Sequence, residues 1–404
     1  MVKLGEIFIA LSHYSYYKMK QDYKIKKQTS IFKELEKYKK KDFTFSSGHI
    51  LGSMCTQPHP IAKKVYMQFL ETNLGDPKLF PGTKELESKY IQFIAKLLNA
   101  PEKHTGLIGS GGTESNITAM WLAKQNSGKK EIIVGENAHF SFEKIASLMD
   151  MKIVTIPSDD NQCIDICHVE EKINKNTAAI VCIAGSTELG TIDPIPKLSK
   201  ICQENSVFLH VDAAFGGFVI PFLKKLGYNT PGFDFRLKGV STISIDAHKM
   251  GCSAIPLGTL MIRDNKKIDD ISVESHCVSS EKQAGILGTR SGGPVAAAYA
   301  VSSFLGEEGY TKIVKQCMNV TNHAEKRIKE IGLSLAVKPT MNVIGIKLKN
   351  PTRVTKMLTE YGWKVNEMRR ISCIRLVLMP HVTKKNIDDF IPDLKKTCVK
   401  LGEI

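Results

Sequence analysis

The 404-residue chain contains no apolar run long enough to cross a membrane. Near the N-terminus, the run Ile7–Leu11 is shorter than the hydrophobic region of a secretory signal. No other stretch approaches the ~18 uninterrupted apolar residues that a spanning helix needs. We therefore expect a soluble protein that stays in the cytoplasm and has no membrane partner.

Cysteine pairs with the spacing of a zinc site are also missing. Cys163 and Cys167 lie nearest to each other, but no matching His or Cys pair follows them. The ten cysteines form no Cys-x-x-Cys, the spacing typical of structural zinc sites, so we expect no metal. Thiols dispersed along a chain fit a reducing compartment. With 42% hydrophobic and 24% charged residues, the composition is otherwise that of a globular protein with a large core.

Acidic residues are the scarcer charged class. The chain has 56 Lys and Arg against 41 Asp and Glu, a net charge of +15, and much of the lysine lies between residues 18 and 41. A basic surface can attract nucleic acid or anionic lipid. No nucleic-acid-binding motif accompanies it, so we expect solvated helix faces and no nucleic-acid partner.

Two buried strands are predicted to end in reactive side chains. The apolar runs Ser206–Val211 and Gly239–Ile245 each break into small residues, the pattern of a strand that opens into a functional turn. Asp212 follows the first run, and His248 and Lys249 follow the second. Taken alone, such residues are more often caps or solvated strand ends. Together they are what pyridoxal 5′-phosphate (PLP) requires: a lysine for the Schiff base and an acid that keeps the pyridine nitrogen protonated.

A third segment predicts a phosphate site. In the stretch 107–116 an apolar strand runs into three glycines and Thr113, and a helical pattern follows. Glycines let the backbone approach an anion, and a helix N-terminus supplies unpaired N–H groups and a positive dipole end. The segment lacks the motifs of nucleotide and dinucleotide sites. Combined with Asp212 and Lys249, it favours PLP over a simple glycine-rich turn.

Two further segments could contribute side chains to such a site. His139 lies where the predicted strand Glu131–Val134 gives way to a helix, so its ring could stack on a flat cofactor. An isolated histidine at such a place is more often a helix cap or a core residue. The loop Gly185–Thr191, after the strand Ala178–Ala184, carries hydroxyl groups that could hydrogen-bond the cofactor.

These segments resemble the fold-type I PLP enzymes, and among them the group II amino-acid decarboxylases. Asp-Ala-Ala at 212–214, His-Lys at 248–249 and Ala-His-Phe-Ser at 138–141 are that family's marks. The resemblance narrows to the archaeal L-tyrosine/L-aspartate decarboxylases, which make tyramine for methanofuran or β-alanine for coenzyme A. It covers roughly residues 32–390, with the motifs Gly52-Ser-Met-Cys55, Phe69-Leu-Glu-Thr-Asn-Leu-Gly-Asp-Pro77, Thr187-Glu-Leu-Gly-Thr-Ile-Asp193, Phe215-Gly-Gly-Phe-Val-Ile-Pro-Phe222, Ile286-Leu-Gly-Thr-Arg290 and Met379-Pro-His381.

The resemblance implies PLP as the cofactor, an L-amino acid as the substrate and a homodimer with each active site at the subunit interface. It also implies that Arg290 reaches the cofactor or substrate region across the subunit boundary. The residues implied to hold PLP are Lys249 (Schiff base), Asp212 (pyridine nitrogen), Ala214 and His139 (the two faces of the ring), Gly112, Thr113 and His248 (phosphate) and Thr187 (ring hydroxyl).

The loop after the lysine departs from the family. Decarboxylases of this group carry there a tyrosine that helps to reprotonate the carbanion left by CO2, but residues 271–280 contain none. By spacing, His276 or Cys277 occupies its place. His276 suits a proton donor, with an ordinary pKa of about 6.5; Lys249 is the alternative donor. Ala247 also replaces a usual proline, which leaves the mechanism unaffected.

Strand and helix patterns alternate from residue 107 to about 262. This order predicts an α/β protein with a mostly parallel sheet covered on both faces, whose strand ends bring the catalytic groups to one edge. We expect an N-terminal extension and helical segment at 1–60, a PLP-binding large domain at 61–300 and a small C-terminal α+β domain at 301–404.

Other functions stay open. A PLP-dependent carbon–carbon lyase of the sphingosine-phosphate-lyase type shares the scaffold, but would need extra phosphate ligands and usually a membrane anchor. A cysteine desulfurase would need a different pattern around its loop cysteine. The combination of Lys249, Asp212 and His139 argues against a PLP-binding relative without turnover or a basic anion-binding protein, although the missing loop tyrosine keeps that reading open.

Overall fold

The computed structural model describes residues 26–276 and 282–404, and the chain divides into two units, Met1–Ser47 and Gly48–Ile404. The described part of the first unit consists of helix α2 (Lys26–Lys39) and the short 3-10 turn η1 (Phe45–Ser47). Helix α2 exposes the apolar side chains of Ile31, Phe32, Leu35 and Tyr38. The predicted boundaries after residues 60 and 300 stay predictions.

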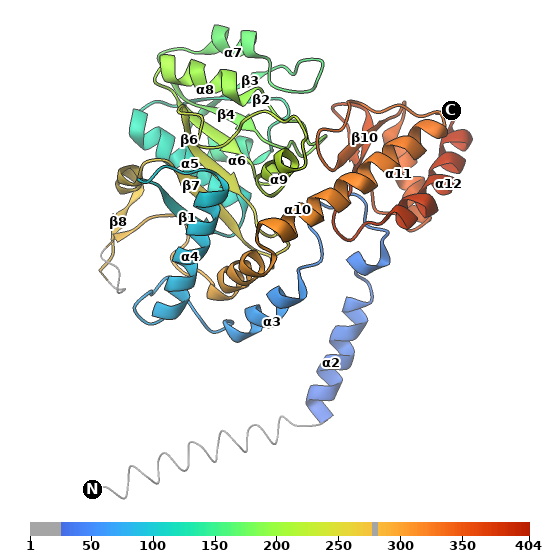
Figure 1. Cartoon of the computed structure of the whole chain (residues 1–404), viewed down its shortest axis with the longest axis horizontal. Coiled ribbons are helices and arrows are strands. Elements are labelled where there is room, and N and C mark those ends of the chain that lie inside the picture. Colours follow the sequence, from blue (N-terminus) through green and yellow to red (C-terminus); the bar gives the residue numbers. More distant parts are fainter. Residues whose placement is uncertain (1–25, 277–281) are drawn as a thin grey trace, which may run out of the picture. The chain divides into compact units, whose positions relative to one another are not determined.

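The second unit is built around a seven-stranded sheet (Figure 1). The strand order is β1-β7-β6-β5-β4-β2-β3. From β6 to β3 all neighbours pair in parallel, whereas β7 runs antiparallel to both β6 and β1. The strands are β1 (Thr105–Gly109), β2 (Glu131–Gly135), β3 (Lys152–Ile156), β4 (Thr177–Ile183), β5 (Phe208–Asp212), β6 (Val240–Ile245) and β7 (Gly258–Ile262).

Helices cover both faces of this sheet because its strands are apolar on both sides. Along β4, Ala179 and Val181 pack with α5 and α6, while Ile180 and Cys182 belong to the opposite core, which α4 and α8 join. Successive side chains of a strand point to opposite faces, and a strand buried on both is a continuous apolar run. The helices are α3 (Pro60–Gln68), α4 (Pro81–Leu97), α5 (Gly112–Ser127), α6 (Ser141–Met149), α7 (Ile166–Lys172), α8 (Ile195–Glu204) and α9 (Ile220–Lys225), with the short turns η2 (Gly216–Phe218) and η3 (Asn265–Ile271).

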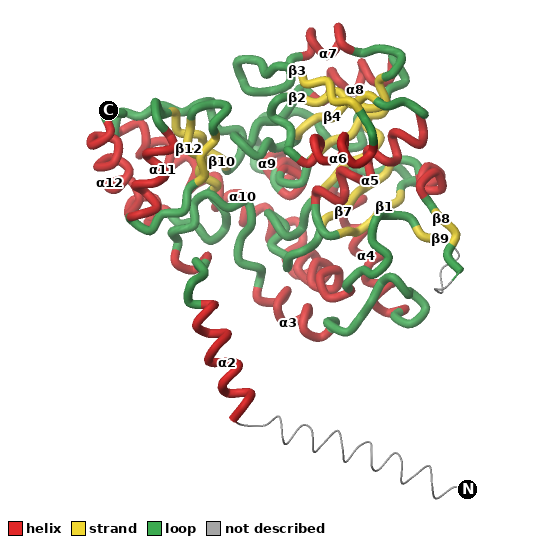
Figure 2. Tube along the Cα trace, turned by 180° about the vertical axis from the view of Figure 1, so that it is seen from behind, coloured by secondary structure: helices red, strands yellow, loops and turns green. Residues whose placement is uncertain are grey.

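A smaller layer of sheet and helix completes the second unit (Figure 2). The long helix α10 (Gly292–Glu330) leads to it and is kinked at Gly306, whose φ of 52° is not helical. Strands β10 (Val343–Lys347), β12 (Cys373–Val377) and β11 (Asn366–Met368) pair antiparallel in that order, and α11 (Pro351–Glu360) and α12 (Lys384–Leu401) share a buried core with them. A two-stranded ribbon, β8 (Val273–Glu274) with β9 (Lys282–Gln283), precedes α10.

The α/β class and the mostly parallel sheet predicted from the sequence are confirmed. The parallel strands point the same way, so the segments that follow β2, β4, β5 and β6 leave one edge of the sheet together, and ligands of open α/β sheets bind at that edge. Within the described ranges, no helix is long and apolar enough to cross a bilayer.

The fold predicts a contrast between two leucines. Leu209 on the central strand β5 is fully buried, whereas Leu148 on α6 is 72% exposed. Leu209→Ala should lower the free energy of unfolding by about 2–5 kcal/mol, because it leaves a cavity in a packed core. Leu148→Ala should change it by no more than about 0.5 kcal/mol. Urea denaturation of both variants measures the difference, and equal losses would contradict the assigned core.

Candidate active site

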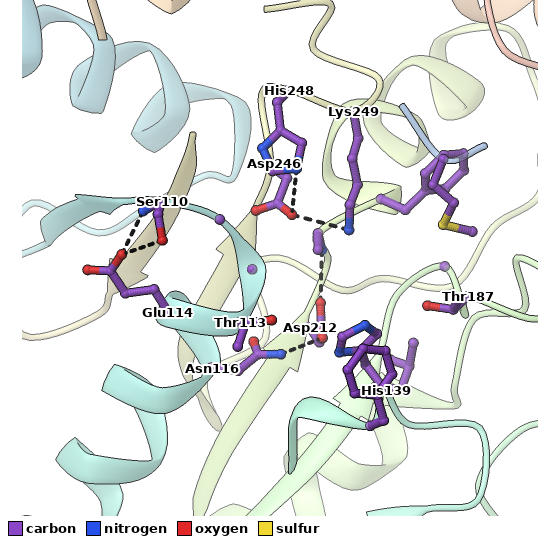
Figure 3. A pocket seen from close by; sticks show the side chains of 18 of the residues that line it. Ser110, Thr113, Glu114, Asn116, His139, Thr187, Asp212, Asp246, His248 and Lys249 are labelled. Carbon is purple, nitrogen blue, oxygen red and sulfur yellow. Dashed lines mark hydrogen bonds and ion pairs between the residues drawn. The ribbon is translucent and has the colours of Figure 1, made fainter. Parts of the chain in front are cut away.

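A cavity of about 350 Å³ lies where the predicted catalytic segments meet. Its walls come from the segments after β1, β2, β4, β5 and β6, and the side chains point into it from all sides (Figure 3). The structure brings together here eight of the residues proposed from the sequence: Gly112, Thr113, His139, Thr187, Asp212, Ala214, His248 and Lys249.

The turn between β1 and α5 forms a cradle for an anion. Gly111, with a φ of 150°, precedes α5, whose first residue is Gly112. A Cβ on Gly112 would lie 3.0 Å from Asp246 Oδ2 and 3.2 Å from Ala214 Cβ, so a side chain would crowd this floor of the cavity. The first N–H groups of a helix lack partners within the helix and favour a negative ligand. The cradle therefore fits a phosphate group.

Asp212 is the last residue of β5, and its buried carboxylate accepts three hydrogen bonds. Its Oδ2 accepts from Asn116 Nδ2 at 2.8 Å, and its Oδ1 accepts from the Ala214 N–H at 3.1 Å and from Ser244 Oγ at 3.2 Å. Burial opposes ionisation, but the nearby positive charge, chiefly Lys249, and these hydrogen bonds hold the pKa of Asp212 below its ordinary value. Asp212 is therefore ionised at neutral pH.

His210 and Thr242, behind Asp212, orient the Asn116 side chain. His210 Nε2 lies 3.0 Å from Asn116 Oδ1, and His210 Nδ1 lies 2.9 Å from Thr242 Oγ1. Because the Asn116 amide nitrogen donates to Asp212, its oxygen must accept; His210 Nε2 therefore carries the proton and Nδ1 accepts from the Thr242 hydroxyl. Burial lowers the pKa of His210 to about 4, which keeps the ring neutral.

Lys249 and His248 share a carboxylate neighbour, Asp246, directly after β6. Lys249 Nζ lies 3.2 Å and His248 Nε2 3.7 Å from Asp246 Oδ2. His248 Nδ1 lies 2.6 Å from the Leu257 carbonyl oxygen and 3.2 Å from the Leu257 backbone nitrogen, so Leu257 fixes the ring. Figure 3 shows the three side chains converging beside the cradle.

His139 begins the turn into α6 and presents its ring to the cavity. Its Nδ1 accepts from the Ser141 N–H at 3.2 Å, and its ring lies against Phe140 with centroids 4.1 Å apart. Burial lowers the pKa of His139, with the Asp212 charge opposing it, so the ring is neutral at physiological pH. On the neighbouring loop, the Thr187 carbonyl accepts from Arg375 Nη1 at 2.5 Å.

Two predicted residues lie elsewhere. His276, just after β8, is exposed and does not line the cavity; Cys277 lies outside the described residues. The Arg290 guanidinium pairs with Glu87 and donates to the Leu74 carbonyl at 3.1 Å, which ties it to α4 and the loop before that helix. Its predicted reach across a subunit boundary stays a prediction.

Three site residues went unrecognised in the sequence: Asn116, His210 and Asp246. Asn116 lies one helical turn after the cradle, and Asp246 lies three residues before Lys249, so local spacing offered a signal for both. His210 lies within the predicted strand 206–211 and carries no local signal, because its function depends on strand pairing with Thr242.

The cavity therefore combines an anion cradle, an ionised carboxylate and a lysine amine. These groups match the phosphate, the pyridine nitrogen and the aldehyde of one ligand, PLP. Fold and site together define a PLP-dependent enzyme of the α/β class.

Comparison with known proteins also identifies a PLP-dependent enzyme. Residues 67–349 match the model of the pyridoxal-dependent decarboxylase conserved domain. A probable L-tyrosine/L-aspartate decarboxylase of Methanothrix thermoacetophila is 43% identical over 354 residues, 87% of this chain and 91% of that protein. The L-aspartate/L-glutamate decarboxylase of Pyrococcus horikoshii is 45% identical over 362 residues, 88% of this chain and 94% of the relative.

Solved structures share the fold over almost the whole chain. A sphingosine-1-phosphate lyase of Burkholderia pseudomallei superposes with a TM-score of 0.86 at 25% identity and covers 93% of this chain and 91% of its own. The glutamate decarboxylase of Lactobacillus brevis gives 0.82 at 23% identity and 92% of each chain. The chain belongs to the pyridoxal-dependent decarboxylase family. Its cofactor is PLP and its reaction class is carboxy-lyase.

The cradle generates a prediction about cofactor affinity. Gly112→Ala should weaken PLP binding at least about tenfold, or about 1.4 kcal/mol, the scale of one strained contact. Gly82→Ala is the matched control, because a Cβ there meets no atom within 4 Å. Titration of the cofactor-free protein with PLP measures both affinities. Equal affinities would contradict the position of the cradle.

Proposed function

We propose that this decarboxylase acts on L-aspartate and makes β-alanine, with L-tyrosine and its product tyramine as the second candidate. L-aspartate is common to the names of the relatives from Methanothrix and Pyrococcus. β-Alanine would feed coenzyme A synthesis, and tyramine would feed methanofuran synthesis.

The observation that carries the proposal is that Lys249 and Asp212 line one cavity beside the Gly112 cradle. When bound, PLP supplies an electron sink for the electron pair that remains at Cα as CO2 leaves. In our proposal Lys249 bonds covalently to the cofactor. Asp212, ionised and fixed by its donors, holds a proton on the pyridine nitrogen and so keeps the sink effective.

The remaining residues position the ring and its phosphate. Neutral His139 would cover one face of the ring, and Ala214, whose side chain is small, would leave room on the other. Thr113 and His248 would bind the phosphate together with the cradle N–H groups. Thr187 would supply a hydroxyl for the ring hydroxyl.

A proton must then reach Cα. We propose His276 as the donor, supplied by a neighbouring subunit, because it is exposed and does not line the cavity of its own chain. Lys249, which already lies in the cavity, is the alternative. An imidazole with a pKa near the working pH is an effective donor.

Product analysis with a panel of L-amino acids tests the substrate. With PLP present, L-aspartate should give β-alanine and CO2 faster than L-tyrosine or L-glutamate gives product. Lys249→Ala should abolish turnover by several orders of magnitude, because the covalent link is lost. The exposed Lys238→Ala should leave it unchanged. Activity retained in Lys249→Ala would overturn the assignment.

The same assay separates the main alternative, a carbon–carbon lyase, which the fold shared with the Burkholderia enzyme supports. A lyase would cleave a phosphorylated amino alcohol into an aldehyde and phosphoethanolamine, with no CO2. Release of CO2 from an amino acid excludes that reading.

We also propose that the protein is a cytoplasmic homodimer. Phe140, next to His139, lines the cavity yet is 59% exposed, as expected where a partner covers the opening. The nine described cysteines are all free, which supports a reducing compartment.

Subunit mixing tests the dimer. If His276 is lent across the interface, a heterodimer of Lys249→Ala and His276→Ala chains contains one complete site. In a random 1:1 mixture about half of the dimers are heterodimers, and each has one of its two sites complete, so mixing should restore up to about a quarter of the wild-type activity. An active protein that sediments as a monomer at assay concentration would rule this out.

A further inference from the structure

Asp246 is a buried carboxylate with no role in the reaction proposed above. Its side chain is 2% exposed. The backbone N–H of Lys249 donates to the Asp246 carbonyl at 3.3 Å, so one tight turn carries both residues. The same turn brings Asp246 Oδ2 to 3.2 Å from Lys249 Nζ, inside the cavity. Figure 3 shows the contact.

The carboxylate has little freedom to leave this position. A Cβ on Gly258 would lie 2.7 Å from Asp246 Oδ1, and one on Gly112 would lie 3.0 Å from Oδ2, so two backbone segments close in on the group. Oδ1 has no hydrogen-bond partner among the described residues. A buried anionic oxygen without a donor is costly. The Lys249 cation is the close neighbour that offsets the charge.

Several groups face the Lys249 amine. They are the carboxylates of Asp246 and Asp212, the Cys55 thiol and the imidazoles of His139 and His248. Asp212 already accepts three hydrogen bonds from other groups, whereas Asp246 Oδ2 accepts from Lys249 itself. Burial opposes a charged amine, but the carboxylates, Asp246 first, raise the pKa of Lys249 above its ordinary value.

We propose that Asp246 is a positioning residue that holds the Lys249 side chain in the cavity as an ammonium ion and takes its proton when the amine reacts. When Lys249 condenses with the aldehyde of PLP, the nitrogen lone pair forms the new bond to carbon. One proton of the ammonium passes to Asp246 Oδ2. The other two leave with the carbonyl oxygen as water. The inference rests on the proposed role of Lys249.

The test measures the reactivity of the Lys249 amine directly. Cofactor-free protein is mixed with pyridoxal, an aldehyde without phosphate, across a pH series; borohydride traps the adduct, and mass spectrometry quantifies labelling at Lys249. The labelling rate against pH gives the apparent pKa of the amine. In the wild type it should lie at or above the ordinary lysine value of about 10.4. In Asp246→Asn the apparent pKa should fall by about one unit or more.

Two variants control the result. Asp246→Glu keeps the charge on a side chain one methylene longer, which must fit between the Gly112 and Gly258 backbones. When the variant folds, as circular dichroism checks, it should keep the raised pKa, which a purely structural role of the side chain would not predict. Asp150→Asn removes a carboxylate that is 88% exposed and pairs with Lys130, and should leave the Lys249 profile unchanged.

If the pKa of the Lys249 amine in the wild-type protein lies below the ordinary lysine value, the proposal is wrong. This measurement needs no variant, so the test does not depend on whether Asp246→Asn folds. An unchanged pKa in a folded Asp246→Asn protein overturns the proposal as well. If the shift is found but the enzyme releases no CO2 from any amino acid, the proposed function fails and this inference stands.

Discussion

Moving a carboxylate out of water costs on the order of several kcal/mol unless other donors replace the water. At Asp212 the replacements come from three places: the Asn116 amide on α5, the Ser244 hydroxyl on β6 and the backbone N–H of Ala214. The charge thus persists only if β5 and β6 pair in register and α5 lies against them. The need to keep this one group ionised therefore constrains how β5, β6 and α5 pack together.

Two carboxylates of the site, Asp212 and Asp246, lie in different environments. Asp212 accepts three hydrogen bonds from uncharged donors and is therefore free to pair with a protonated ring nitrogen. Asp246 Oδ2 contacts Lys249 Nζ, and Asp246 Oδ1 has no hydrogen-bond partner among the described residues. The negative charge of Asp246 is therefore balanced by the Lys249 ammonium. Two acids at successive strand ends can therefore serve different functions in one cavity.

Features that depend on short stretches of sequence were predictable. Apolar runs that end in Asp212 and Lys249, and glycines before α5, identified the sheet edge, and the resemblance to the decarboxylase family completed the eight predicted residues that line the cavity. The His210 function was not predictable, because its contacts with Asn116 and Thr242 arise from helix placement and strand register. His276 was chosen by its place in a loop, and a loop position does not determine which cavity its side chain can reach.

The protonation of the cofactor ring nitrogen tests the central claim most directly. In holoenzyme prepared with PLP labelled with ¹⁵N in the ring, the nitrogen chemical shift should be that of a protonated pyridine throughout neutral pH. In Asp212→Asn, with PLP still bound, it should change to that of the unprotonated ring. The same shift in both proteins would show that the buried carboxylate does not hold the proton, and would contradict the account.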